Sequence, residues 1–345
     1  MNVRMASDSD KQSWDAYVWA HPEGLAYHRF AWKTAVAEAY GFEGIYLMAE
    51  RNGNICGVFP LIDFKVPFGG RSLVSLPYCD VGGPLTDNPE TTRLLLQSAR
   101  EWCGTHGCGK LTVRYGKGPV QDVETQRFSK VRMVLELPAT ADILLEGFKA
   151  KLRSQVKKPV RDGLTAKLGG AELVNEFYRI FCPNMRSLGS PVHSKRWIAA
   201  VVEAFGPHAR VGVVYSPEGT PAAAGILLLH NRTVSVPWAS SRREMNRLNA
   251  NALLYWTFLS HAAQEGFTRF DFGRSTPGEG TYKFKEQWGA HPEPLLWVEY
   301  GRDEETLIEG GHPSAARKLI ESCWRRMPLE VCNTLGPLVR RHISL

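Results

Sequence analysis

The stretch that decides the fold covers residues 270–290 and reads FDFGRSTPGEGTYKFKEQWGA. Its first residues alternate in character, so the Asp271 carboxylate and the phenyl rings on either side of it are expected on opposite faces of a β-strand. Three glycines then allow a tight backbone path. The residues after them alternate again, which predicts a second strand. Its two faces would be Tyr282, Phe284 and Trp288 on one side, and Lys283 and Lys285 on the other.

This predicted strand has two interpretations. Aromatic planes beside ammonium groups can hold a nucleobase or a sugar, and an ammonium group can stabilise developing negative charge. The alternative is a β-hairpin with a half-buried aromatic face and no role in binding.

The sequence on the N-terminal side repeats one order of elements: strand, turn, strand, loop, helix, strand. The first copy comprises two strands in residues 46–65 joined by an Asn-Gly turn, a helix over 90–103 and a strand over 110–115. The second copy comprises three strands between 209 and 239, a helix over 249–265 and a strand over 268–273. A repeated order of this kind predicts two similar domains, although chains that mix helices and strands also produce it by chance.

A helical segment is expected between the two copies, over about residues 140–207. Leu145, Phe148, Leu152 and Val156 recur at helical spacing and predict one buried stripe. The cations Lys149, Arg153 and Lys157 recur at intervals of four, which predicts an adjacent basic stripe. Pro159 should end or kink this helix, because proline lacks a backbone N–H. The basic stripe is either a solvated face or the binding surface for an anion.

Composition limits the class of protein. The chain has 345 residues, 43% of them hydrophobic and 22% charged, which suits two globular domains. Its net charge of +7 suits an anionic partner such as phosphate, RNA or a lipid headgroup. No apolar run is long enough to span a bilayer, and no secretory signal is recognisable, so we expect a cytoplasmic protein.

Several kinds of site are absent from the sequence. There is no phosphate-binding P-loop, no GxSxG nucleophile elbow, no HExxH and no CxxC. The seven cysteines are scattered and odd in number, which predicts neither a disulfide framework nor a metal site.

The C-terminal segment 301–345 differs in character from the rest. Residues 314–343 combine an amphipathic helical pattern with several arginines, and Pro328 interrupts the pattern. Such a segment either caps a domain or lies on a membrane surface, so peripheral contact with the inner membrane is a further expectation.

The stretch 270–290 resembles the C-terminal signature of the Fem-type (FemAB) peptidyltransferase family, in the branch found beside PEP-CTERM/exosortase and exopolysaccharide genes. Three other segments are similar to parts of that family. They are KLRSQVKKPVRDGL (151–164), GGPLTD (82–87) and the pair Trp32-Lys33. Together the similar segments lie within residues 10–300.

The resemblance implies an α/β fold with two tandem GNAT-like domains, over residues 1–145 and 146–300, with a substrate groove between them and the tail 301–345 after them. It implies that Lys33 and Arg153 clamp the diphosphate of an acceptor, and that Phe284 and Lys285 stand beside the reacting carbonyl. We expect Lys285 to be catalytic and Asp87 to act as the base. The expected substrate-binding residues are Lys33, Arg153, Lys157, Arg274, Tyr282, Phe284 and Trp288.

The expected activity is an N-acyltransferase or aminoacyltransferase that forms an amide on an amine of a cell-envelope precursor. That precursor would be a diphosphate-containing or lipid-linked glycan of the peptidoglycan or exopolysaccharide type. No tightly bound cofactor and no metal are expected. Aminoacyl-tRNA and acyl-CoA both remain open as donors, because the chain has neither the heptads of a tRNA-binding coiled-coil arm nor a glycine-rich loop in residues 240–250. The alternatives are an acetyl-CoA-dependent N-acetyltransferase and a non-catalytic module that binds a glycolipid or RNA.

Overall fold

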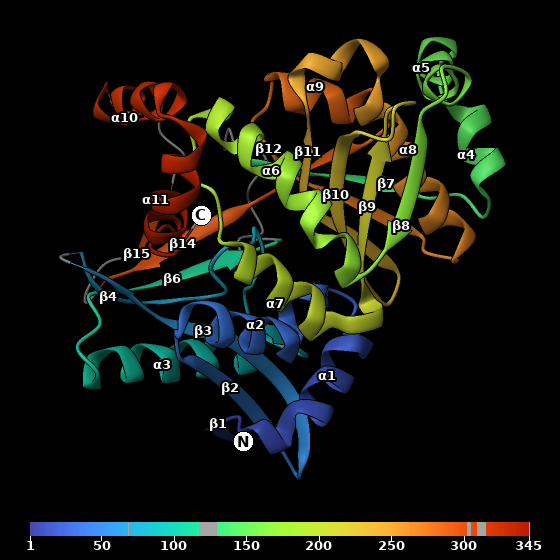
Figure 1. Ribbon diagram of the computed structural model, residues 1–345. Coiled ribbons are helices and arrows are strands. Elements are labelled where there is room, and N and C mark those ends of the chain that lie inside the picture. Colours follow the sequence, from blue (N-terminus) through green and yellow to red (C-terminus); the bar gives the residue numbers. More distant parts are fainter. Residues whose placement is uncertain (68, 117–129, 302–304, 309–314, 345) are drawn as a thin grey trace. The chain divides into compact units, whose positions relative to one another are not determined.

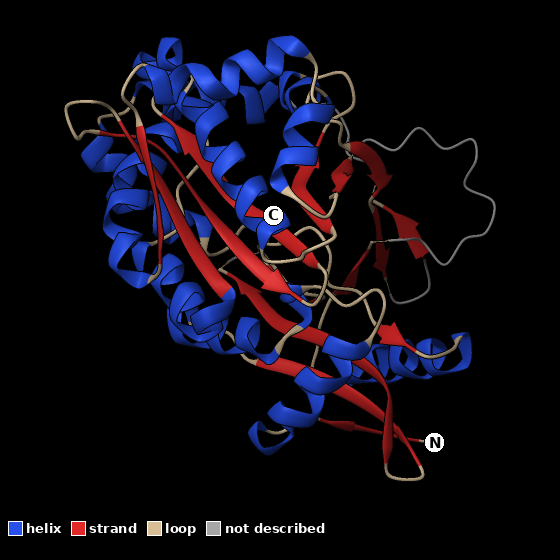
Figure 2. Cartoon of the chain, turned by 90° about the vertical axis from the view of Figure 1, so that its right-hand side faces the viewer, coloured by secondary structure: helices blue, strands red, loops and turns tan. Residues whose placement is uncertain are grey.

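The computed structural model describes residues 1–67, 69–116, 130–301, 305–308 and 315–344 (Figure 1). The chain forms two compact units, each with its own sheet. The first comprises Met1–Arg132, Glu293–Gly311 and His342–Leu345, and the second comprises Met133–Pro292 and His312–Arg341. Figure 2 shows the helices and strands of both units in a second view.

The sheet of the first unit has the strand order β1-β2-β3-β4-β6-β14-β15, and β5 pairs with β3 beside this path. Neighbouring strands are antiparallel except for the parallel pair β4 and β6. The strands are β1 (Asn2–Met5), β2 (Gly44–Arg51), β3 (Asn54–Val66), β4 (Gly70–Val74), β5 (Leu85–Thr86), β6 (Lys110–Tyr115), β14 (Leu296–Tyr300) and β15 (Glu305–Leu307).

Helices cover both faces of this sheet. The amphipathic helix α3 (Pro89–Thr105) presents Leu95, Ala99 and Cys103 to a core that includes Leu47. Tyr46, the neighbour of Leu47 in β2, points to the opposite face of the sheet, because side chains alternate along a strand. There Tyr46 stacks on Trp14 of α1 (Lys11–Ala20) at 4.7 Å between ring centroids, and Phe30 of α2 (Phe30–Tyr40) meets the same Tyr46 edge-on.

The sheet of the second unit has the order β13-β7-β12-β11-β10-β9-β8. Its strands are β7 (Val131–Glu136), β8 (Thr165–Gly169), β9 (Ala209–Tyr215), β10 (Pro221–His230), β11 (Thr233–Ser241), β12 (Arg269–Ser275) and β13 (His291–Pro294). Its helices are α4 (Ala141–Gly147), α5 (Ala150–Arg161), α6 (Val174–Leu188), α7 (Lys195–Phe205), α8 (Ala250–Gln264), α9 (Gly280–Glu286), α10 (Ala315–Arg326) and α11 (Leu329–Arg340).

Helix α8 lies close against this sheet because two strand residues are glycines. A Cβ atom on Gly212 of β9 would lie 2.2 Å from Cε1 of Phe258, and one on Gly225 of β10 would lie 2.8 Å from Cε2 of the same ring. Phe258 is fully buried there. The two glycines therefore make room for an aromatic ring at the centre of the unit.

The repeated order of elements predicted from the sequence is confirmed. In the first unit β2, β3 and β4 are antiparallel neighbours, and β4 is followed in space by the parallel strand β6 after helix α3. In the second unit β9, β10 and β11 are antiparallel neighbours, and β11 is followed by the parallel strand β12 after helix α8. Each half thus contains one antiparallel set closed by one parallel pair.

The strand predicted over residues 282–288 is wrong, because Gly280–Glu286 form helix α9. Phe284 and Trp288 are four residues apart and their rings lie 6.2 Å apart, as expected for one face of a helical segment. Both rings also meet Tyr255 of α8. Packing against α8 therefore selects the helical period over the alternation visible in the sequence.

The single buried stripe predicted from Leu145 to Val156 is also wrong in part. Helix α4 ends at Gly147, and α5 begins at Ala150 after an extended residue, Lys149. Phe148, Leu152 and Val156 are buried, but Leu145 is only half-buried. Pro159 lies two residues before the end of α5, in keeping with the predicted stop.

The two units also differ in extent from the domains expected at 1–145 and 146–300. Residues 133–145 lie in the second unit, and β14 lies in the sheet of the first unit, paired with β6. In the expected tail 301–345, residues 302–304, 309–314 and 345 lie outside the described residues. The described part of the tail contains β15 and the helices α10 and α11.

No helix among the described residues is both long and apolar enough to cross a membrane. All seven cysteines are free thiols. Within the described ranges, no three His, Cys, Asp or Glu side chains come together as a metal site.

Candidate functional site

The parallel strands β11 and β12 part in the middle of the second sheet. They pair only from Thr233 with Arg269 to Ser235 with Asp271, although β11 continues to Ser241 and β12 to Ser275. The register between β10 and β11 shifts at the same point, between the pairs Leu228–Ser235 and Ile226–Trp238. A bulge of this kind bends its strand, and Pro237 within it has no N–H to donate. The bulge therefore turns β11 away from β12 and opens the sheet there.

Side chains of the second unit stabilise the separated end of β12. The Asp271 carboxylate accepts a hydrogen bond from the Gly273 amide at 2.8 Å. The Lys285 ammonium, on α9, donates to the carbonyl oxygens of Gly273 at 2.9 Å and Arg274 at 2.8 Å. Lys285 is only 7% exposed. It thus supplies hydrogen bonds to carbonyl groups that a neighbouring strand would otherwise satisfy.

A polar cavity of about 220 Å³ lies where β11 ends and α8 begins. The turn η5 (Arg243–Leu248) connects the two elements, and Asn249 has a φ of +54° directly before α8. Asparagine is among the few residues other than glycine that adopt this left-handed conformation readily. The lining residues are Gln155, Ser241, Arg242, Met245, Asn246, Asn249, Ala250, Asn251, Ala252, Phe284 and Gln287.

Positive charge gathers at this cavity. Arg242 lines it, and Arg243 and Arg247 follow in the adjoining turn, where both are exposed. The only acid in that turn is Glu244, 3.7 Å from the Arg242 guanidinium. The N-terminal end of α8 contributes its unsatisfied N–H groups and the positive end of the helix dipole. The arrangement is suited to an anionic group, a phosphate above all.

In the first unit the corresponding parallel strands are β4 and β6, and the segment that follows β4 hydrogen-bonds to β6 beyond the end of their pairing. Beyond Val74 of β4, the amides of Gly82 and Gly83 both donate to the carbonyl of Arg114 on β6, at 3.0 and 2.8 Å. The Arg114 guanidinium donates to the carbonyls of Leu76 and Cys79, each at 2.9 Å. In the GGPLTD segment, a Cβ atom on Gly83 would lie 3.2 Å from the Arg114 carbonyl oxygen of β6, and one on Gly82 would lie 2.6 Å from Cβ of Leu76.

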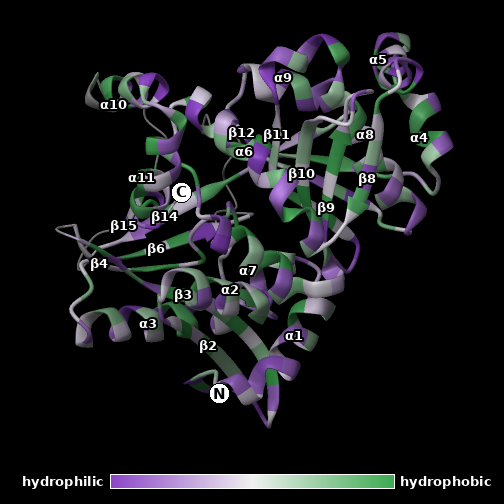
Figure 3. Cartoon of the chain, viewed as in Figure 1, coloured by the Kyte–Doolittle hydropathy of each residue, from purple (hydrophilic) through white to green (hydrophobic). Residues whose placement is uncertain are grey.

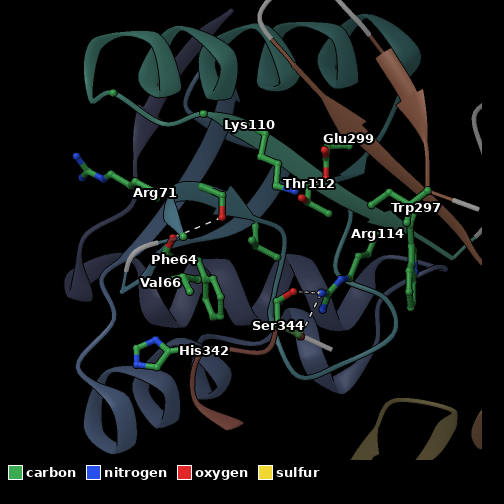
Figure 4. Close-up of a pocket in the computed structure, with 17 residues that line it drawn as sticks. Phe64, Val66, Arg71, Lys110, Thr112, Arg114, Trp297, Glu299, His342 and Ser344 are labelled. Carbon is green, nitrogen blue, oxygen red and sulfur yellow. Dashed lines mark hydrogen bonds and ion pairs between the residues drawn. The ribbon is translucent and has the colours of Figure 1, made fainter. Parts of the chain in front are cut away.

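A separate cavity of about 730 Å³ lies on one face of the first sheet (Figure 4). Its wall includes the ion pair between Lys110 and Glu299, at 2.7 Å, and the Trp297 ring. Arg114 also lines it and donates to the carbonyl and hydroxyl oxygens of Ser344, each at 3.1 Å. The charged groups of this cavity are thus bonded to neighbouring groups of the protein itself.

The residues predicted in the second unit lie in different settings. Arg153 donates to the carbonyls of Phe148 at 2.5 Å and Glu146 at 3.2 Å, so it caps the C-terminal end of α4, whereas Lys157 is exposed. Phe284 lines the polar cavity. Trp288 is 1% exposed and packs edge-on against Phe148, so it belongs to the core. Tyr282 and Arg274 are both half-buried, on α9 and at the end of β12.

The residues predicted in the first unit have partners of their own. The Lys33 ammonium lies 3.2 Å from the Asp8 carboxylate and 4.4 Å from the centre of the Phe30 ring. Asp87 is exposed and accepts a hydrogen bond from the Tyr17 hydroxyl at 2.7 Å. Burial, and then this hydrogen bond, raise the pKa of Tyr17 well above its usual range. The clamp formed by Lys33 and Arg153 stays a prediction, because the two residues belong to different units.

The sequence did not single out the residues that line the polar cavity, apart from Phe284. Residues 240–250 were considered for a phosphate-binding loop and set aside because they contain no glycine. The signal that could have found the loop is Asn249, since asparagine can take the positive φ that such a loop needs. Gln155 and Gln287 have no local signal, because they reach the cavity only through the packing of α5 and α9 beside α8.

Comparisons with known proteins agree with this architecture. A family model described as an acetyltransferase (GNAT) domain matches residues 148–286. Among solved structures, the chain is similar to FemX, with a TM-score of 0.67, 16% identity, and coverage of 93% of this chain and 100% of the other. It is also similar to the C-terminal domain of a putative lysylphosphatidylglycerol synthetase from Agrobacterium fabrum (TM-score 0.55, 14% identity, coverage 84% and 92%).

A tandem GNAT protein from the clavulanic acid biosynthesis pathway is a third similar structure (TM-score 0.50, 13% identity, coverage 90% and 100%). No curated protein matches the chain. At these identities the likeness concerns the fold. The expected α/β fold with two GNAT-like domains and C-terminal helices is confirmed.

Proposed function

We propose that this protein is an N-acyltransferase or aminoacyltransferase whose acyl donor binds in the second unit, at the opening between β11 and β12. The observation that carries the proposal is the bulge in β11, which separates two parallel strands beside a polar, cationic cavity at the start of α8. The match of this unit to an acetyltransferase (GNAT) domain supports the same conclusion.

The donor would lie with its phosphate at the loop of residues 242–247 and its acyl arm between the strands. Three arginines and the N-terminal end of α8 would bind the phosphate. The separated strand edges offer main-chain groups that can bond an extended arm in the way an added strand does. Both donors under consideration, acyl-CoA and aminoacyl-tRNA, carry phosphate, so this chemistry suits either one.

The reaction we propose is attack by a neutral amine on the carbonyl carbon of the donor ester or thioester. A C–N bond forms, the C–O or C–S bond breaks, and the amine proton passes through a base to the leaving oxygen or sulfur. Asp87 remains our proposed base. Lys285 would act by holding Gly273 and Arg274 at the open strand end and by favouring the negative charge that develops on the carbonyl oxygen.

For the acceptor we propose an amine on a diphosphate-containing or lipid-linked cell-envelope precursor of the peptidoglycan or exopolysaccharide type. Lys33, Arg153 and Lys157 would bind its phosphate groups, and Arg274, Tyr282 and Phe284 would contact it near the reacting carbonyl. Trp288 would contribute by supporting α9 from the core. A solved neighbour named for lysylphosphatidylglycerol synthesis supports a lipid-linked acceptor.

The test compares donor binding to the wild type and to the double variant Arg242→Gln/Arg247→Gln by calorimetry, with acetyl-CoA and with aminoacyl-tRNA as separate ligands. We expect one of them to bind, and the double variant to bind it at least about tenfold more weakly, because each lost phosphate contact removes a charge-assisted hydrogen bond. Arg161→Gln is the matched control, since Arg161 is 77% exposed on α5 and does not line the cavity.

Two outcomes would contradict the proposal. If neither ligand binds, or if the double variant and the control bind equally well, the loop is not the donor site. Binding without turnover of any amine would favour the alternative of a non-catalytic module. Tight binding and turnover of acetyl-CoA would favour the acetyl-CoA-dependent alternative over aminoacyl transfer.

A further inference from the structure

The C-terminal helices α10 and α11 pack on the second unit through one face only. Trp324 of α10 and Cys332 of α11 are 8% and 2% exposed, and Gly336 lies against Val192 so closely that a Cβ atom would be 3.0 Å from it. Arg186 of α6 donates to the Met327 carbonyl, between the two helices, at 2.6 Å. Through this face the two helices cover α6, as expected for a segment that caps a domain.

Both helices also carry apolar side chains that are exposed. Leu319 and Ile320 of α10 are 65% and 63% exposed. On α11 three exposed apolar residues recur at intervals of four and three, which places them on one stripe. They are Val331 (38% exposed), Leu335 (44%) and Leu338 (59%). A cap alone would not require these residues, because none of them contributes to the buried face.

The same segment is strongly cationic. Residues 315–341 contain six arginines and lysines (Arg317, Lys318, Arg325, Arg326, Arg340, Arg341) and two glutamates (Glu321, Glu330), a net charge of 6 − 2 = +4 out of +7 for the whole chain. Lys318 and Arg326 are both exposed on α10; Lys318 directly precedes the apolar pair, and Arg326 lies nearly two turns after it. Figure 3 shows hydrophobic and hydrophilic residues side by side on α10.

We propose that the exposed face of α10 and α11 binds the surface of an anionic membrane. The leucines, isoleucine and valine would enter the boundary between headgroups and acyl chains, and the cations around them would face anionic headgroups. A second copy of the chain fits this surface less well, because each copy would bring a charge of +4 against the same charge. The inference does not depend on the acyl-transfer activity.

The test is co-flotation of the full chain with vesicles of phosphatidylcholine alone or of phosphatidylcholine mixed with phosphatidylglycerol. We expect binding to the mixed vesicles, little binding to phosphatidylcholine, and weakening by salt. Leu319→Asp/Ile320→Asp should reduce binding to the mixed vesicles by about tenfold or more, and so should Lys318→Glu/Arg326→Glu. Val160→Asp is the matched control, because Val160 is also apolar, 60% exposed and on a basic helix of the second unit.

Thermal unfolding and size-exclusion chromatography of each variant complete the experiment. The exposed positions should tolerate the changes, so the unfolding temperature should stay close to that of the wild type. Failure of the wild type to bind the mixed vesicles, or equal binding by the variants and the control, would overturn the proposal. So would a shift of the aspartate variants from dimer to monomer with vesicle binding unchanged, which would identify the face as a contact between copies.

Discussion

Replacement of Lys285 by methionine removes the ammonium group from the end of β12 and keeps most of the aliphatic stem. Had residues 282–288 formed an exposed strand, this change would have left folding stability nearly unaltered. Lys285 is instead 93% buried and donates to two backbone carbonyls, those of Gly273 and Arg274. Lys285→Met should therefore destabilise the fold as well as affect the site.

The size of the effect follows from the two carbonyls. Leaving a buried acceptor without its donor costs about 1–3 kcal/mol. Gly273 and Arg274 are half-buried, so water can replace part of what is lost. We therefore expect a loss of about 2–4 kcal/mol in the free energy of unfolding. Turnover should fall by about 100-fold or more, because the strand end and the charge beside the reacting carbonyl are both disturbed.

Urea unfolding followed by tryptophan fluorescence would measure the stability, with Trp288 as a reporter in the same unit. Lys283→Met is the matched control, since Lys283 is an exposed lysine on the same helix, and its variant should stay within about 0.5 kcal/mol of the wild type. Lys285→Arg should recover part of the stability because it keeps a charged donor. A Lys285→Met variant as stable as the Lys283→Met control would refute the reasoning.

Three further predictions concern packing and titration. Gly212→Ala should lower the unfolding temperature, because the new Cβ would lie 2.2 Å from the Phe258 ring; overpacking of this kind costs about 1–3 kcal/mol. Gly53→Ala is the control for lack of space, since Gly53 lies in a turn with no atom within 4 Å, although its φ of +79° adds backbone strain. The Asp63 side chain is fully buried. Burial alone would raise its pKa, but the hydrogen bonds from Arg71 and Lys65 together outweigh burial and lower the pKa. Because the pKa is lower in the folded state, the ionised Asp63 stabilises the fold above the unfolded pKa of about 4, and this stabilisation is lost as the pH falls from there through the folded pKa. Urea unfolding measured across this pH range should show the loss in the wild type and not in Asp63→Asn. Burial raises the pKa of Tyr17, Tyr115 and Tyr255, so the unfolded chain releases these protons first and stability should fall as the pH rises above about 10; a flat stability profile there would contradict the assignment.

Local pattern was enough for the elements whose neighbours along the chain are also their neighbours in space. The pair β2 and β3 is joined by a two-residue Asn-Gly turn, and its alternation predicts the strands without further information. Helices α3 and α8 are long enough, at 17 and 15 residues, for a helical prediction to hold. The duplicated order of these elements then predicts two similar domains.

Tertiary structure decided what short or mixed patterns leave open. Helix α9 has seven residues, too few for alternation to be told from a helical period, and the rings of α8 select the helix. The edge strand β8 pairs only with β9 and is mostly exposed, so its sequence carries no buried pattern. The strand β14 joins the first sheet from the far end of the chain, which no local signal predicts.

The candidate site divides in the same way. Residue types in the sequence singled out the segments 151–164 and 270–290, whereas 240–250 was set aside because it contains no glycine. Which side chain does what depends on contacts between those segments. Lys285 donates to the carbonyls of Gly273 and Arg274, which lie beyond the last pair of β11 and β12, and Arg153 donates to the carbonyls at the end of α4. Charge and spacing along a chain do not specify such partners, because hydrogen bonds to backbone carbonyls can be satisfied by any segment that the fold brings within reach.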